Sequence, residues 1–284
     1  RAIQNPDSLQ AQFAAGEYEA VLAQCNAQID ALDNRFERYR PELLAPLQLR
    51  AEALFELREY ETAIVAYRQT LQVMRMNEGL HAPKQVPILR RLAEVHQLLG
   101  NAVGANNFEE AAFSVAQRSS SPDSAALLDD LHRLANWYLK AGYYTSARKL
   151  FKRARLIAHS NLPQEKSAYA KSLEGIAESF VGLAFSNFDR KSEAYYSQFT
   201  PANMHFDRQF VSRISGPEVS HSAAFSKFSG GEKALQDLVS FWRAQNSPFD
   251  TQLIKALINL GDWHARFRDP RAALQSFQEA RLLM

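Results

Sequence analysis

The chain has 284 residues, of which 46% are hydrophobic, and its 33 Lys and Arg residues against 31 Asp and Glu residues give a net charge of +2. This balance argues against general nucleic-acid binding, which normally shows a strongly basic face. The single cysteine, Cys25, excludes an intramolecular disulfide framework and a cysteine-rich zinc site, and we interpret it as a core residue. No stretch approaches the roughly 20 apolar residues that a membrane-spanning helix needs.

A motif with a period of 42 residues runs along the chain. One column of the motif holds Gly16, Arg58, Gly100, Gly142 and, three periods later, Arg268. These positions separate segments whose apolar residues recur at i, i+3, i+4 and i+7, the spacing of one face of an α-helix. A fixed period of helix pairs predicts an all-α solenoid, so we expect one domain over residues 1–284 and no sheet.

Seven units are predicted in chain order, near residues 2–43, 44–85, 86–127, 128–169, 170–211, 212–253 and 254–284. The turns of the first three units fall at Gly16, Arg58 and Gly100. Before the fourth unit, Ser121 is predicted to N-cap the next helix, with Pro122 in its first turn.

The fourth unit is the most regular, because two amphipathic segments of Leu128–Asn161 meet there at Gly142. Small residues such as Ala135 and Ala147 alternate with rings such as Phe151. A pair of helices packs closely when rings on one lie over small residues on the other. We therefore predict ring-over-small-residue contacts between the helices.

The pattern weakens after a helix predicted from about Glu165 to Phe185, so units five and six are expected to be degenerate. Asn187–Ser229 should be the least regular and most mobile part of the chain. The run from Ser229 through Gly230 and Gly231 to Glu232 is interpreted as a capping box that opens a helix over Lys233–Gln245. Asp269 and Pro270 are predicted to cap the last helix.

The order of small residue, aromatic, Gly at the turn, aromatic and Ala resembles the tetratricopeptide repeat. The usual period of that family is about 34 residues, and the longer period here resembles the kinesin light chain-like branch, as does the join Glu78–Gly100. The resemblance implies a right-handed superhelix of antiparallel helix pairs. It also implies that the first helices line a concave groove whose ligands are short peptide segments.

A polar stripe beside the packing face of the first helices is the candidate binding surface. Its predicted binding residues are Gln48, Glu52, Arg90, Arg91, Glu94, His132, Arg133, Asn136, Lys140, Lys171 and Asn259. The same stripe also carries Glu174, Glu178, Lys255, Asp262 and Arg266. Asn136 and Asn259 resemble groove asparagines that hold a peptide backbone. The alternative is that the stripe is merely solvated.

The partner is expected to contact the second to fourth units, around Arg90, Arg91, Arg133, Asn136 and Lys140. Since Glu94 and Asp129 offset these cations only in part, an acidic segment should be favoured. Leu98 and Leu139 are the nearest candidates for a hydrophobic anchor.

Catalytic templates are missing from the sequence. No His-Glu-x-x-His zinc pattern occurs among the seven histidines, and His96 and His264 are interpreted as core residues. Gly230–Lys233 lacks the spacing of a phosphate-binding loop, and no Gly-x-Ser-x-Gly elbow occurs. Asp129 and Asp130 are adjacent on a helix and face different ways. We therefore predict no enzyme activity, no cofactor and no metal site.

The sequence favours a non-catalytic protein–protein interaction scaffold that binds a peptide or helical segment of a partner. A ligand- or peptide-responsive regulator and the repeat portion of a larger enzyme, with its catalytic domain outside these residues, are the alternatives. No nucleic acid and no membrane span are expected. The cytoplasm is favoured, although export stays open because the chain begins at Arg1.

Overall fold

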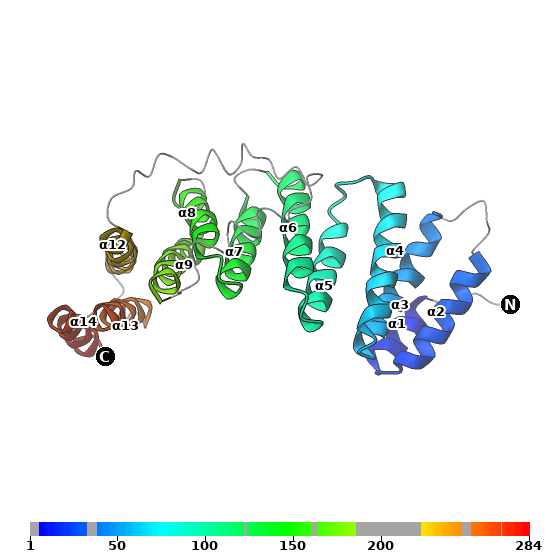
Figure 1. The fold of residues 1–284 in the computed structure, drawn as a ribbon, viewed down its shortest axis with the longest axis horizontal. Coiled ribbons are helices and arrows are strands. Elements are labelled where there is room, and N and C mark those ends of the chain that lie inside the picture. The colour runs from blue at the N-terminus through cyan, green and yellow to red at the C-terminus, as the bar shows by residue number, and fades with distance from the viewer. Residues whose placement is uncertain are drawn as a thin grey trace. The chain divides into compact units, whose positions relative to one another are not determined.

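The structure, a computed structural model, describes residues 6–32, 39–121, 124–160, 164–185, 223–245, 251–267 and 269–284 (Figure 1). These ranges contain α-helices and one 3₁₀ turn, Pro41–Leu43, and within them there is no strand. The chain is therefore all-α, as predicted. None of the described helices is both long enough and apolar enough to cross a membrane.

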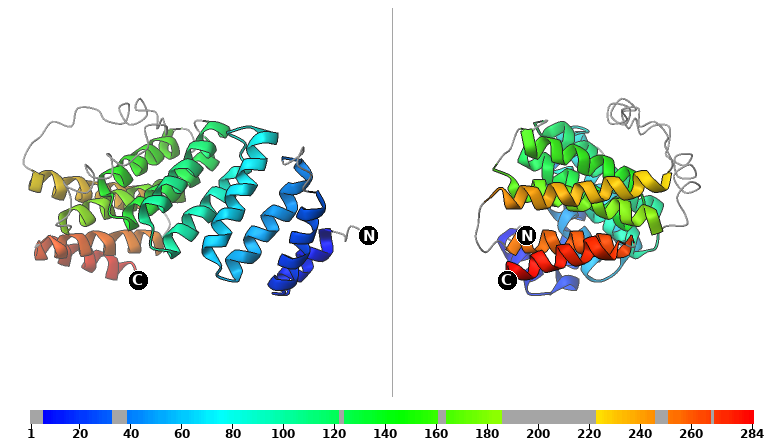
Figure 2. Two further views of the ribbon diagram at one scale, coloured as in Figure 1. Left: turned by 45° about the vertical axis from the view of Figure 1, so that its right-hand side comes forward. Right: turned by 90° about the vertical axis from the view of Figure 1, so that its left-hand side faces the viewer.

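The chain divides into two compact units, Arg1–Ser121 and Pro122–Met284. The first unit contains α1 (Pro6–Ala14), α2 (Tyr18–Leu32), α3 (Leu44–Glu56), α4 (Tyr60–Glu78), α5 (Gln85–Leu98) and α6 (Ala102–Ser119). The second contains α7 (Ala125–Lys140), α8 (Tyr144–Ser160), α9 (Lys166–Phe185), α12 (Ala223–Arg243), α13 (Thr251–Arg266) and α14 (Pro270–Leu282). Within each unit, every helix packs against the next along the chain, which makes an α-solenoid of antiparallel helix pairs (Figure 2).

The turn column of the motif has a structural cause. Gly16, Gly100 and Gly142 end the first helices of their pairs with φ angles of 82°, 72° and 84°. Glycine adopts this left-handed region without the steric cost that a Cβ brings. Arg58 takes the same place with a φ of 61°, and it is the only non-glycine residue with positive φ in the described ranges. Arg268 lies outside the described residues.

Rings pack over small residues, as predicted. A Cβ added to Gly175 would collide with the ring of Phe151, and one added to Gly261 would collide with the ring of Phe277. Ala135 and Ala147 are fully buried. The glycines thus let neighbouring helices approach to a distance that a larger side chain would prevent.

The core assignments of single residues are confirmed. Cys25 is fully buried, and burial raises the pKa of its thiol to about 11, so the thiol stays protonated. His96 and His264 are both buried. His96 stacks on Phe108, and its Nδ1 lies 3.0 Å from the amide nitrogen of Asn101, the N-cap of α6.

The predicted capping box at Ser229–Glu232 is wrong, because these residues lie inside α12. A Cβ on Gly230 would collide with Phe180 of α9, and one on Gly231 would collide with Trp263 of α13. The two glycines therefore let α12 fit between its two neighbours. Packing on both sides sustains the helix although each glycine disfavours helix by about 1 kcal/mol relative to alanine.

The sequence also predicted the N-caps of two helices, α7 and α14. Ser124, not Ser121, caps α7, since its hydroxyl accepts a hydrogen bond from the backbone N–H of Leu127 at 3.2 Å. Asp269 caps α14 as predicted, accepting from Ala272 at 3.1 Å.

The predicted fifth and sixth units look different in the structure. The helix α12 packs directly against α9 on one side and α13 on the other, so it takes the place of the second helix in a pair that α9 begins. Residues 187–222 of the stretch expected to be irregular lie outside the described residues. The remaining residues, 223–229, form the start of α12.

Candidate functional site

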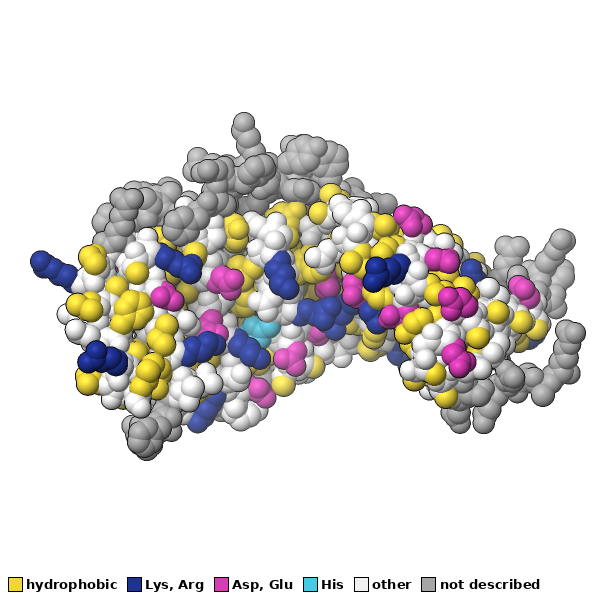
Figure 3. Space-filling model, turned by 90° about the horizontal axis from the view of Figure 1, so that it is seen from below, with side chains coloured by type: hydrophobic (Ala, Val, Ile, Leu, Met, Phe, Trp, Pro, Cys, Tyr) yellow, Lys and Arg dark blue, Asp and Glu magenta, His cyan; other side chains and the backbone are white. Residues whose placement is uncertain are grey.

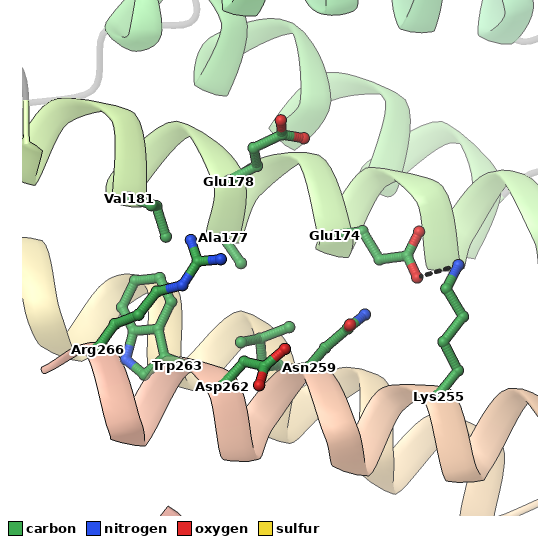
Figure 4. Close-up of a pocket in the computed structure, with 10 residues that line it drawn as sticks. Glu174, Ala177, Glu178, Val181, Lys255, Asn259, Asp262, Trp263 and Arg266 are labelled. Atoms are coloured by element: carbon green, nitrogen blue, oxygen red, sulfur yellow. Dashed lines mark ion pairs between the residues drawn. The ribbon is translucent and has the colours of Figure 1, made fainter.

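The first helices of two pairs in the second unit, α9 and α13, line a cavity of about 350 Å³ together with one residue of α12 (Figure 4). The lining residues are Glu174, Ala177, Glu178, Val181, Leu235, Lys255, Asn259, Asp262, Trp263 and Arg266. Ala177, Leu235 and Trp263 are buried and form an apolar floor.

Charged side chains of both signs surround this floor. Lys255 Nζ of α13 lies 3.2 Å from Glu174 Oε1 of α9, and this ion pair spans the cavity at one end (Figure 4). At the other end, the side chain of Arg266 extends toward Val181 of α9. Asn259 lies between these ends, on α13. An asparagine amide offers one acceptor and two donors, which suits the main chain of an extended segment.

The cavity depends on how α12 separates α9 and α13. Phe180 of α9 packs on Gly230, and Trp263 of α13 packs on Gly231, so both first helices are fixed on the same helix. The Trp263 ring also packs against Phe267, with ring centroids 4.4 Å apart. Rigid aromatic contacts of this kind hold the cavity floor in place.

Solved structures share this arrangement of helices. Two crystal structures of a Podosopora anserina protein described as kinesin light chain, with nearly identical TPR-like repeats, have TM-scores of 0.55 and 0.56 at 12% identity. The matches cover 87% and 86% of this chain and 95% and 96% of those chains. The chain has a tetratricopeptide-like fold. Protein–protein interaction is the general role of such repeats.

A second likeness connects the TPR-like fold to a larger protein. The signal transduction ATPase with numerous domains (STAND) from Pyrococcus horikoshii, which carries a tetratricopeptide repeat sensor, has a TM-score of 0.53 at 10% identity. The match covers 97% of this chain and 35% of that chain. Identities this low concern the fold alone. No protein-family model and no curated protein matches the sequence.

Several predicted binding residues of the TPR-like array lie at the surface of the second unit. Arg133, Asn136 and Lys140 are exposed along α7, and Lys171 is exposed on α9. Asn259 lines the cavity between α9 and α13. Glu174, Glu178, Lys255, Asp262 and Arg266, which the sequence placed on the same stripe, line that cavity too.

His132 is the exception in this unit, because its side chain is buried between α7 and α9. Its Nε2 lies 2.8 Å from Ser172 Oγ, and Ser172 donates its own hydroxyl proton to the carbonyl oxygen of Ala168 at 2.8 Å. His132 Nε2 must therefore carry a proton and donate it. Burial and then the nearby Lys171 charge lower the pKa of His132 to about 4, against the opposing effect of Asp129. His132 joins two helices and does not present its ring to a ligand.

The two predicted hydrophobic anchors, Leu98 and Leu139, also differ in their exposure to solvent. Leu139 is buried, so it cannot anchor a partner, whereas Leu98 is 54% exposed at the end of α5. Leu98 lies one 42-residue period before Lys140, which is also exposed, so the two leucines occupy different places in the motif.

In the first unit, the predicted cation Arg91 is held by two acids. Its Nε lies 3.2 Å from Glu52 and its Nη1 lies 3.0 Å from Glu94. Its guanidinium carbon also lies 4.7 Å from the centre of the Phe55 ring. Burial raises the pKa of Glu52, and the Arg91 charge opposes that shift. Glu52 therefore offsets the positive charge of Arg91 in addition to Glu94, the neighbouring acid that the sequence analysis named.

The other stripe residues of the first unit lie at or near the surface. Gln48 is exposed on α3, and Arg90 is half-buried on α5. On the face drawn in Figure 3, Lys and Arg side chains stand among Asp and Glu side chains and do not form one basic patch. Arg90 and Arg91 belong to the first unit, whereas Arg133, Asn136 and Lys140 belong to the second.

Sequence reasoning missed the floor of the cavity. Trp263 and Leu235 are apolar residues at helical spacing, and nothing in their own neighbourhood marks them as a binding surface. The adjacent glycines Gly230 and Gly231 were the available signal, since two small residues in a helix permit close approach from two sides. In the described part of the chain, no group of three or more His, Cys, Asp or Glu side chains could hold a metal ion.

Proposed function

We propose that this protein is a non-catalytic interaction scaffold whose second unit binds an extended peptide segment of a partner protein. The segment lies along α7, α9 and α13 and places one apolar side chain in the cavity between α9 and α13. The observation that carries the proposal is the combination of an apolar floor, the Asn259 amide and charged walls in one cavity of about 350 Å³. Ligand cavities of proteins commonly have volumes of about 300–1,000 Å³.

The ion pair between Lys255 and Glu174 is weak enough for a ligand to displace. The Lys255 side chain is 59% exposed, and exposed pairs contribute only about 0–1 kcal/mol. A ligand carboxylate or ammonium group can therefore replace one partner at little cost. The cavity walls thus accommodate either sign of charge.

Exposed cations give the segment a direction. Exposed cations outside the cavity include Arg133, Lys140 and Lys171, whereas the cavity itself is lined by three acids and two cations. An acidic residue of the partner segment should therefore lie toward α7. Such charges accelerate and orient association more than they determine the final affinity.

The test combines capture with matched variants. The purified chain is used to capture partners, which are identified by mass spectrometry, and the captured segment is synthesised and titrated by calorimetry. Asn259→Ala with Arg266→Ala should weaken binding about tenfold or more while the helical circular dichroism is unchanged. Arg133→Ala with Asn136→Ala should also reduce capture.

Gln278→Ala, an exposed change on α14, is the control and should bind as the parent does. Unchanged affinity in the Asn259 and Arg266 variant would place binding elsewhere.

A second candidate is a ligand-responsive regulator, and the likeness to the STAND protein with a tetratricopeptide repeat sensor supports it. In that case the same cavity would sense a peptide, and the output would come from elements outside these residues. The full reading frame around this sequence would distinguish the two candidates.

A further inference from the structure

The cavity between α9 and α13 has a counterpart in the first unit, between α3 and α5. Both are spaces between neighbouring first helices. Glu178 of α9 lies three periods of 42 residues after Glu52 of α3, and Asp262 of α13 lies four periods after Glu94 of α5. The repeat therefore places an acid at the same position on each of these four helices.

The burial of the neighbouring residues agrees with this register. Buried, half-buried and exposed positions of residues 91–98 recur over residues 259–266 with one exception. The positions of residues 51–55 likewise recur over residues 177–181 with one exception. Equivalent residues of the two units therefore face the core, or the space between first helices, in the same way.

In the first unit, a guanidinium of the chain itself fills this space. Arg91 of α5 lies with its Nε 3.2 Å from Glu52 of α3 and with its Nη1 3.0 Å from Glu94. Its guanidinium carbon lies 4.7 Å from the centre of the Phe55 ring. Two carboxylates and an aromatic ring thus surround one arginine head group, an arrangement that suits the planar guanidinium.

In the second unit, the two acids are kept but the arginine is not. Asn259 stands at the place of Arg91, and Val181 stands at the place of Phe55. An asparagine side chain is shorter than an arginine side chain and carries no charge. Instead of a filled space, α9 and α13 line a cavity of about 350 Å³. Both acids at its wall are exposed, and neither makes an ion pair within the described part of the chain.

The two cations of the cavity do not neutralise these acids. Lys255 pairs with Glu174 at one end, with 3.2 Å between Nζ and Oε1 (Figure 4). Arg266, at the other end, makes no ion pair with Glu178 or Asp262. Since Lys255 and Glu174 offset each other, two carboxylates remain against one guanidinium. The charge of the cavity therefore favours a further cation.

We propose that the partner segment inserts an arginine between Glu178 and Asp262, two residues from the apolar side chain that enters the cavity. Alternate side chains of an extended segment project to the same side, so both can reach the cavity. The arginine of the partner then makes the contacts that Arg91 makes within the first unit. This inference rests on the proposed function and adds the identity of a second side chain to it.

The probe is a fluorescein-labelled peptide with the sequence Ser-Arg-Ala-Leu-Ala-Arg-Ser. It carries an arginine on both sides of the leucine, so either direction of the peptide presents one at the right spacing. The matched control peptide has citrulline in place of both arginines, because citrulline has nearly the same shape and no charge. In fluorescence anisotropy titrations with the 284-residue chain, the arginine peptide should bind about tenfold more tightly than the citrulline peptide.

Variants of the chain locate this preference. Glu178→Gln with Asp262→Asn removes two exposed charges and should reduce the preference to less than about twofold. Asp129→Asn, which removes an exposed carboxylate of α7, is the control and should leave the preference unchanged. Asn259→Arg rebuilds the internal arginine of the first unit and should also abolish the preference. Asn259→Ala, in contrast, should weaken both peptides alike and preserve it.

The remaining outcomes separate this inference from the proposed function. Equal binding of both peptides to the parent chain, weakened by Asn259→Ala, would overturn the arginine site and leave the proposed function standing. A preference for arginine that persists in Glu178→Gln with Asp262→Asn would also overturn the site, because the cation would then bind elsewhere. If neither peptide binds at millimolar concentration, the arginine site and the proposed function are both wrong.

Discussion

His132 should make the second unit lose stability in mild acid. Its ring is buried and donates from Nε2 to Ser172, and the pKa is lowered from 6.5 to about 4, first by burial and then by Lys171. In the unfolded chain the same histidine takes up its proton near pH 6.5. Between these values the unfolded state binds more protons than the folded state, so the free energy of unfolding falls as the pH is lowered.

The magnitude follows from the two pKa values. At pH 5, nearly all unfolded molecules carry the proton and few folded molecules do, which costs about 2 kcal/mol of the free energy of unfolding relative to pH 7.5. The loss reaches about 3 kcal/mol below pH 4 and grows no further. Since domains of this size are commonly stable by about 5–15 kcal/mol, the effect is measurable.

The assay uses the placement of the tryptophans. All three, Trp137, Trp242 and Trp263, lie in the second unit, so tryptophan fluorescence in urea follows the unfolding of that unit. The comparison is between the parent and His132→Leu, which removes the titrating ring and leaves the Ser172 hydroxyl bonded to Ala168. Between pH 7.5 and pH 5 the parent should lose about 2 kcal/mol more than the variant. Equal losses would show that His132 is not held neutral in the fold.

Four substitutions test the packing and the turns. Arg58→Gly should raise the free energy of unfolding of the first unit by about 0.5–1 kcal/mol, because it relieves a left-handed conformation; a urea melt followed by circular dichroism without any gain would argue against strain there. Gly231→Ala should destabilise the second unit by about 1–3 kcal/mol, since its Cβ would collide with Trp263; helix propensity alone predicts the opposite sign, so tryptophan fluorescence distinguishes the two. Gly261→Trp and Ala147→Trp should each lower the melting temperature, and an unchanged value would mean that these residues do not lie between helices.

The sequence predicted the helices well because each helix pair repeats the same local rules. Turn glycines, apolar stripes and small residues are visible without knowing the neighbours. Gly142 ends a first helix because its φ of 84° suits glycine, and Ala135 is fully buried at a position where the motif has small residues. These features depend on spacing along one or two helices, which a linear sequence displays.

The remainder of the site depends on contacts between helices that are distant in sequence. His132 and Arg133 are adjacent on a polar stripe, yet one is buried against Ser172 of α9 and the other is exposed. A rotation of about 100° per residue separates them, and the position of α9 decides which side is covered. The sequence alone could not distinguish a groove histidine from a histidine that joins two helices.

The stretch from α9 to α13 shows why a sequence period and a structural repeat can differ. The 42-residue period predicts two further helix pairs between the turn at Gly142 and the turn at Arg268, because a period depends only on distance along the sequence. Packing instead requires a helix that fits between α9 and α13, and Gly230 and Gly231 let α12 do so. Burial of Phe180 and Trp263 on α12 contributes about 1.5–3 kcal/mol for each large apolar side chain. The α9–α12 pair, and the cavity that depends on it, is therefore stabilised by its own contacts.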